Sequence, residues 1–561
     1  MLSIVTGSRS GYERLQSTSD ADACGDDDLF ALASSLPLLQ TQIPDMETEK
    51  PTTQHREARF AEDTEHEGSG GPIRKTVTNT SDTEKGSSAY AASIESHRAE
   101  RRLLFKLDIL ILPLAVLLYL SAYLDRGNLG NARLQGLQAT VLRGSDTNYS
   151  IALSCFFITY ILLSVPGTLL AKAITPSTSI SIGALIWSIA ATCQAAAFSP
   201  AALYVCRLFV GVGEALFGQA MALYFTYWYL PDELSKRIGL FISSGSVAGA
   251  FGGLISYGVS SLKHPAITRW RILFLIEGIP SFVLAVVVFF FLPSRPQTSR
   301  YLTEDQRAVA LARLNRKNLD EGNTGVDWKA VKRALVDWKT YAVAVIYSCM
   351  NLGLGSVTGF LPTIVQGLGY SNANAQLFTV PPYVVSLVAM LLISSYSDHY
   401  QTRGVPVASV FCISIVGWAI LLGISPVHAT QSALHARYFG CICIVTAGYS
   451  NIPLIISWQS GNTGSQSQRA VSLGMLNAVG QCLSVLAAFL FPTPEGPKFI
   501  KGCATNLAFS ALGLLLAIGM TVYYQLENRR RDKVEGGKPP KDMQINVMSD
   551  YDLATGFRYT P

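Results

Sequence analysis

The chain has 561 residues and a formal net charge of +5, and 49% of its residues are hydrophobic while only 15% are charged. Soluble domains usually carry about a quarter charged residues, so this composition excludes an ordinary soluble protein. A net charge of +5 without a clustered basic face also gives no reason to expect nucleic-acid binding. The mean hydropathy of +0.29 indicates a helical membrane protein.

The N-terminal region differs from the rest of the chain. Residues 1–100 are rich in Ser, Thr, Asp, Glu and Gly, and their one apolar patch, 29–39, is interrupted by Pro37. Such a composition cannot bury enough apolar surface to offset the entropy of ordering. We therefore expect 1–100 to be a disordered tail.

Beyond this tail the apolar residues come in blocks of about 20, which is the length that crosses a hydrocarbon core of roughly 30 Å. We expect an all-α membrane protein with twelve spans, at 107–130, 149–171, 178–198, 201–226, 238–262, 272–292, 341–364, 376–396, 405–425, 436–457, 469–491 and 502–524. The longest gap splits them into two groups of six. This predicts a first half at 101–292, a central loop at 293–339, a second half at 340–525 and a tail at 526–561.

Positive charge is shared unequally between the loops. The central loop carries ten Lys and Arg residues, whereas the connections at 198–201, 365–375 and 426–435 carry none. Arg143 and the connection at 263–271 run against this trend. By the positive-inside rule, the pattern places the central loop and both termini in the cytoplasm, and we expect a multi-pass protein of the plasma membrane.

Six spans, a long cytoplasmic loop and six more spans make up the layout of the major facilitator superfamily, in which two halves move about a central binding site. The layout alone leaves other twelve-span carriers open. The predicted fold is therefore the major facilitator fold, and the polar residues inside the spans must distinguish the possibilities.

The first span ends with a group of polar residues that is costly to bury in lipid. Asp125 and Arg126 are adjacent, and Asn128, Asn131 and Arg133 follow among glycines. Ionisable groups inside a membrane face a polar cavity and a partner, because lipid cannot solvate them. The alternative is that the pair marks a helix end in water. We expect both Asp125 and Arg126 inside a cavity.

The fourth span carries a second charged set. Arg207, Gly211 and Glu214 are spaced i, i+4, i+7, which places them on one helix face. Two ionisable groups in an apolar span either line an aqueous path or form an ion pair that only fixes helix packing.

These stretches resemble the anion:cation symporter family of the major facilitator superfamily, whose fungal branch includes allantoate, nicotinate and pantothenate permeases. The resemblance is carried by Asp125-Arg126-x-Asn128-x-x-Asn131, by the segment RLFVGVGEA that begins at Arg207, and by Trp228-Tyr229-x-x-x-Glu233-x-x-x-Arg237. One departure is Gly218-Gln219, where the family often has proline. The resemblance implies that the charged and amide residues of the first and fourth spans handle substrate and protons.

The second half supplies polar groups rather than charges. Tyr449, Asn451 and Trp458 resemble the family's tenth span, and aromatic and amide side chains there can hold a ring or an amide. Trp458 is equally compatible with an interfacial anchor.

Two pairs of charged residues are candidates for gating at the cytoplasmic side. Glu233 and Arg237 follow the fourth span, and Asp398 and Arg403 belong to a degenerate copy of the superfamily's Gly-x-x-x-Asp-Arg loop. A merely solvated loop is the alternative for the second pair.

Other motifs point to packing, and some are missing. Gly245, Gly249 and Gly253 recur every four residues and predict close helix packing between the halves. We find no metal-ligand spacing, nucleotide loop or nucleophile–base set, so we expect no cofactor, no metal and no enzyme activity.

The predicted function is proton-coupled uptake of a small organic anion, such as a vitamin or nitrogen-source acid, by a monomeric carrier in the lipid bilayer. A membrane nutrient sensor (transceptor) and a proton-driven exporter remain alternatives.

Overall fold

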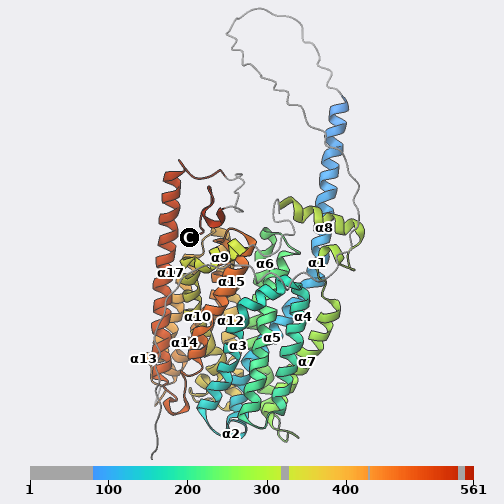
Figure 1. Ribbon diagram of the computed structural model, residues 1–561. Helices are drawn as coiled ribbons and strands as arrows, with labels where there is room; N and C mark the ends of the chain where they lie inside the picture. Colours follow the sequence, from blue (N-terminus) through green and yellow to red (C-terminus); the bar gives the residue numbers. More distant parts are fainter. Residues whose placement is uncertain (1–79, 318–327, 428–429, 541–549) are drawn as a thin grey trace, which may run out of the picture. The chain divides into compact units, whose positions relative to one another are not determined.

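The computed structural model describes residues 80–317, 328–427, 430–540 and 550–561, which form helices joined by turns (Figure 1). Among these residues, twelve helical segments are long and apolar enough to cross a membrane. The all-α class and the predicted number of spans are confirmed. The expected tail at 1–100 lies mostly outside the described residues.

The spanning helices of the first half are α1 (Thr80–Ala132), α3 (Asp146–Ala173), α4 (Pro176–Cys193), α5 (Pro200–Thr226), α6 (Pro231–Ser260) and α7 (Arg269–Phe291). Those of the second half are α10 (Trp338–Gln366), α12 (Val380–Tyr400), α13 (Gly404–Gly423), α14 (Gln431–Gly461), α15 (Gln466–Gly480) with α16 (Cys482–Ala487), and α17 (Ile500–Val534). The shorter elements are η1 (Arg133–Leu137), α2 (Gln138–Thr140), η2 (Gln194–Ala196), η3 (Pro296–Thr298), α8 (Glu304–Lys317), α9 (Trp328–Val336), α11 (Asn372–Leu377), η4 (Thr493–Glu495) and η5 (Tyr551–Leu553).

The first helix is longer than its apolar span. It begins at Thr80, within the expected tail, because extending an existing helix avoids the unfavourable nucleation step. At its other end the chain continues through the π-helical turn η1, where Gly136 has a φ of 99°. A left-handed backbone suits glycine, which has no Cβ to clash, and Gly136 thus breaks the helix after Arg133.

Small residues let the helices of each half pack closely. In the first half, α3 and α4 both pack against α5, and α1 packs against α6. A Cβ at Gly213 on α5 would lie 2.5 Å from the Gly183 carbonyl oxygen on α4, so this crossing admits only glycine. The outward faces carry exposed apolar side chains, such as Leu162, Phe290 and Leu515, as expected of a surface that faces lipid.

The two halves meet along α6 and α12, α3 and α15, and α1 and α10. A Cβ at Gly249 would lie 2.4 Å from the ring of Tyr383, and one at Gly253 would lie 2.6 Å from Thr379 Oγ1. The predicted role in packing the halves is confirmed for Gly249 and Gly253. For Gly245 it is wrong, because a Cβ there would lie 3.2 Å from Tyr123 on α1, within the first half.

The bundle has two distinct ends. Helices α8 and α9 of the central loop lie at one end, which we call the loop end, and α2 lies at the opposite end, which we call the far end (Figure 1). The C-terminal region also differs from its expected tail. Helix α17 continues to Val534, and residues 550–561 pack against the loop end of the second half.

Candidate functional site

A cavity of about 380 Å³ lies between the two halves. Its wall comes from α1, α3, α5 and α6 on one side and from α10, α12, α14 and α15 on the other. It extends to residues at the loop ends of these helices, including Thr226 at the end of α5 and Arg403 at the start of α13. The cavity therefore opens at the loop end.

At the far end the two halves are joined by hydrogen bonds. The Tyr149 hydroxyl donates to the Gly359 carbonyl oxygen at 2.8 Å, and Arg133 Nη2 donates to Thr493 Oγ1 at 2.9 Å. Asp146 Oδ2 accepts from the Thr493 backbone N–H at 2.8 Å. Each contact links the first half to the second, so the cavity is closed on this side.

The most polar part of the cavity is an ion pair between Arg126 on α1 and Glu214 on α5, both predicted site residues. The Arg126 guanidinium lies 4.7 Å from the ring centroid of Tyr123, 4.9 Å from that of Phe156 and 5.5 Å from that of Tyr160. Aromatic faces stabilise a cation in a partly desolvated site. Glu214 is almost fully buried, and its Oε1 has no hydrogen-bond partner among the described residues.

Asp125 does not share this cavity, which corrects the expectation that the adjacent pair acts there together. Its side chain is buried on the other side of α1, near Ser281 and Trp187, with Glu214, Arg207 and Glu277 within electrostatic range. Arg207 Nη1 donates to the Asp125 carbonyl oxygen at 3.4 Å. Consecutive residues point about 100° apart on a helix, so one of two neighbours faces the cavity and the other faces helices α5 and α7.

This second cluster contains several polar atoms without hydrogen-bond partners among the described residues. They include Asp125 Oδ2, both amide atoms of Asn128 and both carboxyl oxygens of Glu277. Buried polar groups normally find partners, so this concentration sets the cluster apart from the apolar packing around it.

The remaining predicted binding residues lie elsewhere. The Asn131 carbonyl oxygen accepts from Gln376 Nε2 at 3.3 Å, which places it in the contact between the halves. Tyr449 is buried beside Tyr383, with ring centroids 5.7 Å apart, and Asn451 borders a separate small pocket. Neither side chain belongs to the described wall of the main cavity.

Trp458 is the clearest displacement from the expected substrate site. It is fully buried at the loop end, where its indole Nε1 donates to the Thr560 carbonyl oxygen at 3.0 Å and its ring packs against Tyr524. The structure supports neither a substrate contact nor an interfacial anchor for Trp458, because the C-terminal segment covers it.

One predicted gating pair forms an internal contact at the cavity mouth. Arg403 Nη2 lies 2.6 Å from Asp398 Oδ1, and both residues line the cavity. Each residue of the other pair has a side-chain partner elsewhere. Arg237 pairs with Asp108 at 2.6 Å, and Glu233 pairs with Arg313 at 3.2 Å.

The aromatic character of the cavity was not predicted from the sequence. Tyr119, Tyr123, Tyr160 and Tyr347 all line it, and three of them come from the first half. The sequence pattern that could have predicted it is the spacing along α1. Tyr123 lies four residues after Tyr119 and three before Arg126, and residues three or four apart share a helix face.

This architecture matches known proteins. A sequence profile described as Major Facilitator Superfamily matches residues 115–489, which is about two thirds of the chain. The chain belongs to the major facilitator superfamily. It is therefore a multi-pass membrane transporter rather than an enzyme.

Curated relatives and solved structures agree with this assignment. The chain is 33% identical to the MFS-type transporter efuF of Hormonema carpetanum, over 77% of this chain and 86% of that one. It is 29% identical to the high-affinity nicotinic acid transporter of Saccharomyces cerevisiae, over 80% of this chain and 84% of that one. The fold is similar to the partially occluded inward-open xylose transporter XylE of Escherichia coli, with a TM-score of 0.58 at 14% identity, covering 73% of this chain and 96% of that one.

Proposed function

We propose that this transporter takes up a small organic anion together with protons by alternating access. The observation that supports this proposal is the Arg126–Glu214 ion pair in the wall of the central cavity. A guanidinium in a largely apolar cavity is a strong site for a carboxylate, because its planar donors match both carboxylate oxygens.

The pair suggests how binding and protonation are linked. Arg126 has one positive charge, and both Glu214 and a substrate carboxylate compete for it. Two carboxylates beside one guanidinium leave an excess negative charge in a poorly solvated space, which is unfavourable. Protonation of Glu214 removes that excess and releases Arg126 to the substrate, so proton and anion travel together.

The buried cluster behind the cavity supplies a second place for a proton. Asp125 and Glu277, together with Glu214 of the cavity pair, are three carboxyl groups within electrostatic range of Arg207. A buried region with more carboxylates than cations favours the uptake of a proton. In this proposal Asp125 and Arg207 act from outside the substrate cavity. Asn128 and Asn131 lie on α1, the helix that carries Asp125, and support that helix.

The cavity wall favours a flat substrate. Tyr119, Tyr123, Tyr160 and Tyr347 surround the space beside Arg126, and aromatic rings bind planar groups by offset or edge contacts. A volume of about 380 Å³ suits a small molecule. The relative named as a nicotinic acid transporter is consistent with an aromatic carboxylate of this size.

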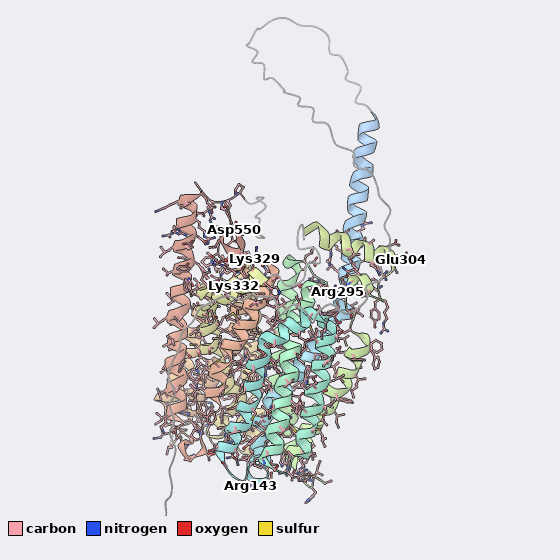
Figure 2. All side chains as sticks on the ribbon, viewed as in Figure 1. Arg143, Arg295, Glu304, Lys329, Lys332 and Asp550 are labelled. Carbon is pink, nitrogen blue, oxygen red and sulfur yellow. The ribbon has the colours of Figure 1, made fainter. Side chains whose placement is uncertain are left out.

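The distribution of charge supports the orientation of the carrier. Figure 2 shows Arg295, Lys329 and Lys332 at the loop end, with Arg143 at the far end. The excess of Lys and Arg in the central loop favours a cytoplasmic loop end by the positive-inside rule. We propose that the carrier is a monomer in the plasma membrane and that the structure corresponds to the state in which the cavity is open to the cytoplasm. In this proposal the pair Asp398–Arg403 and the residues Glu233 and Arg237 act at the cytoplasmic gate.

The test is uptake of a panel of labelled organic acids, including aromatic carboxylates, by permease-deficient cells at two pH values. Glu214→Gln should remove the dependence of uptake on the proton gradient while exchange of internal for external substrate continues. The matched control is Glu495→Gln, since Glu495 pairs with the exposed Lys501 at the far end, and it should behave as the parent. Normal proton-driven uptake by Glu214→Gln would contradict the coupling role.

Arg126 tests the anion site separately. Truncating one partner of a buried charge pair costs about 2–5 kcal/mol, so Arg126→Gln should weaken substrate affinity by about 30-fold or more. Arg271→Gln is the matched control, because Arg271 packs on Phe198 outside the cavity. Unchanged affinity in Arg126→Gln would place the anion elsewhere.

A further inference from the structure

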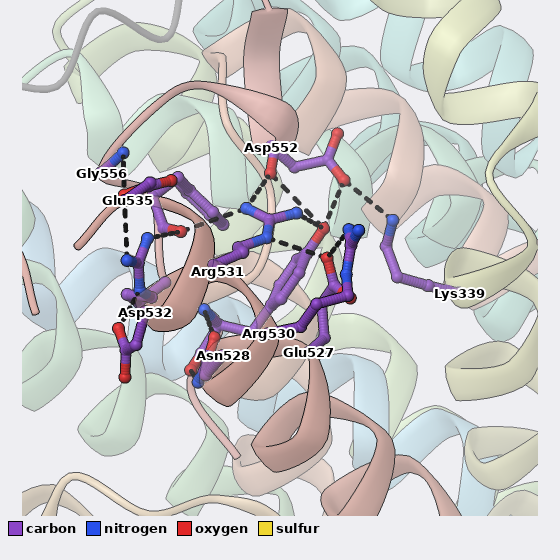
Figure 3. A network of polar contacts seen from close by, with 12 residues as sticks. Lys339, Glu527, Asn528, Arg530, Arg531, Asp532, Glu535, Asp552 and Gly556 are labelled. Atoms are coloured by element: carbon purple, nitrogen blue, oxygen red, sulfur yellow. Dashed lines mark hydrogen bonds and ion pairs between the residues drawn. The ribbon is translucent and has the colours of Figure 1, made fainter. Parts of the chain in front are cut away.

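Residues 550–561, which we call the docked segment, are held by a polar network at the loop end of the second half (Figure 3). Asp552 is fully buried and accepts from Lys339 Nζ at 2.8 Å, from Gln468 Nε2 at 3.2 Å and from the Tyr559 hydroxyl at 2.9 Å. Arg333 Nε lies 3.3 Å from the same carboxylate. One side chain of the segment thus joins α9, α10 and α15.

Helix α17 holds the other side of the segment. Arg531 Nη1 donates to the carbonyl oxygens of Asp552 and Phe557 at 3.0 and 3.1 Å. Arg558 pairs with Asp532 at 2.8 Å and with Glu535 at 2.9 Å. Two of these contacts are made by a buried guanidinium to backbone oxygens, which specifies the path of the chain as well as its charge.

The network keeps Asp552 charged. A buried carboxylate without partners would be strongly unfavourable, but Lys339 and Arg333 lower the pKa of Asp552 to about 2 against the opposing effect of burial. Tyr559 and Gln468 donate to it as neutral groups, and Arg531 bonds to its backbone rather than to its carboxylate. Docking therefore requires no change of protonation at cellular pH.

The last residues of the segment reach the cavity mouth. Trp458 Nε1 and Asn462 Nδ2 donate to the Thr560 carbonyl oxygen at 3.0 and 3.1 Å. The backbone N–H groups of Arg403 and Gly404 donate to a Pro561 oxygen at 2.9 and 3.2 Å. Arg403 itself lines the cavity, so the segment is bonded directly to the α12–α13 turn at the mouth.

We propose that the docked segment is a built-in regulator that holds the cavity open at the loop end. It fixes two turns of the second half, α12–α13 and α14–α15, in the positions seen around the open mouth. To close this end, the first half must approach the same rim where Thr560 and Pro561 lie. A ligand that fits one conformation better than the other shifts the population towards the first, and the segment acts as such a ligand within the chain.

The proposal depends on alternating access but not on the identity of the substrate or on proton coupling. Its test therefore uses a conformational measurement on purified full-length protein. Ser457 lines the cavity, so Ser457→Cys is introduced into a background without native cysteines. The rate at which a bulky thiol reagent labels this cysteine reports how often the loop end is open.

The segment can be displaced without removing any of its polar partners. A Cβ at Gly464 would lie 2.3 Å from the Tyr551 carbonyl carbon, so Gly464→Ala pushes against the backbone of the segment. Gly519→Ala on α17 is the matched control, because a Cβ there meets no atom within 4 Å. Release is verified by trypsin cleavage at Arg558, which its ion pairs protect in the docked state.

Gly464→Ala should slow labelling at Ser457→Cys by about fivefold or more, the low end of ordinary coupling between sites, while Gly519→Ala labels at the parent rate. A stop codon after residue 549 should slow it equally, and this second variant covers the case in which Gly464→Ala leaves the segment docked. The proposal is overturned if the truncated protein folds and labels at the parent rate. A lower melting temperature with an unchanged labelling rate has the same meaning, since it would show that the segment only supports stability.

Discussion

Asp146 is the best place to test whether hydrogen bonds hold the far end closed. Its carboxylate accepts from the backbone N–H and the hydroxyl of Thr493 at 2.8 and 2.7 Å, and it pairs with Arg133 at 2.8 Å. Thr493 belongs to the second half, whereas Asp146 and Arg133 belong to the first. Asp146→Ala therefore removes contacts between the halves that exist only while this end is closed.

The size of the effect follows from the exposure of the site. A hydrogen bond to a charged group contributes about 1.5–3 kcal/mol. The Asp146 side chain is 25% exposed, and water reduces the contribution of each bond. We take about 1.5–3 kcal/mol for both bonds to Thr493 together. Losing both bonds shifts the equilibrium between the closed and the open far end by about 10- to 150-fold towards the open state.

The assay is pulsed electron spin resonance between spin labels on Lys263→Cys and Lys498→Cys. Both residues are exposed at the far end, one in each half. The parent should show one short distance, and Asp146→Ala should add a longer one, its population relative to the short one rising by about 10- to 150-fold.

Glu495→Gln is the control for this experiment, because it breaks an ion pair with Lys501 in the same region but within one half. It should leave the distance distribution unchanged. The reasoning is refuted if Asp146→Ala keeps the distribution of the parent, or if Glu495→Gln shifts it to the same extent.

Two further predictions concern packing and pH. A Cβ at Gly211 would lie 2.1 Å from Thr159 Oγ1, and overpacking costs about 1–3 kcal/mol, so Gly211→Ala should lower the melting temperature in detergent. Gly258→Ala is the control and should leave the melting temperature unchanged, because there is open space around Gly258. Equal melting temperatures for the two variants would contradict this prediction. The pKa of Asp552 lies at about 2, below its ordinary value of 3.8, so its stabilisation is fully present above the ordinary value and is lost only as the pH falls through about 2. Trypsin protection of the docked segment, corrected for protease activity on a free peptide, should be equal between about pH 6 and pH 8, and a loss of protection at the lower pH would disprove the assignment.

The sequence by itself determined the class and layout of the molecule. Apolar blocks of membrane-spanning length set the number of helices, because lipid leaves the backbone no other way to satisfy its hydrogen bonds. The repeated glycines of α6 also identified a close contact between helices, since only small residues permit one. Arg126 and Glu214 were each recognisable as candidate cavity residues, because charge inside an apolar span requires a partner, but only the structure pairs them with each other.

Other features depended on contacts between distant parts of the chain. The sequence could not separate Asp125 from Arg126, since which neighbour faces the cavity depends on how α1 is rotated against α6, α7 and α10. Nor could it place Trp458, whose partner Thr560 is 102 residues away. The segment 550–561 looks like a polar tail by composition, and only the tertiary structure brings Lys339 and Arg333 to Asp552 so that its buried charge is compensated.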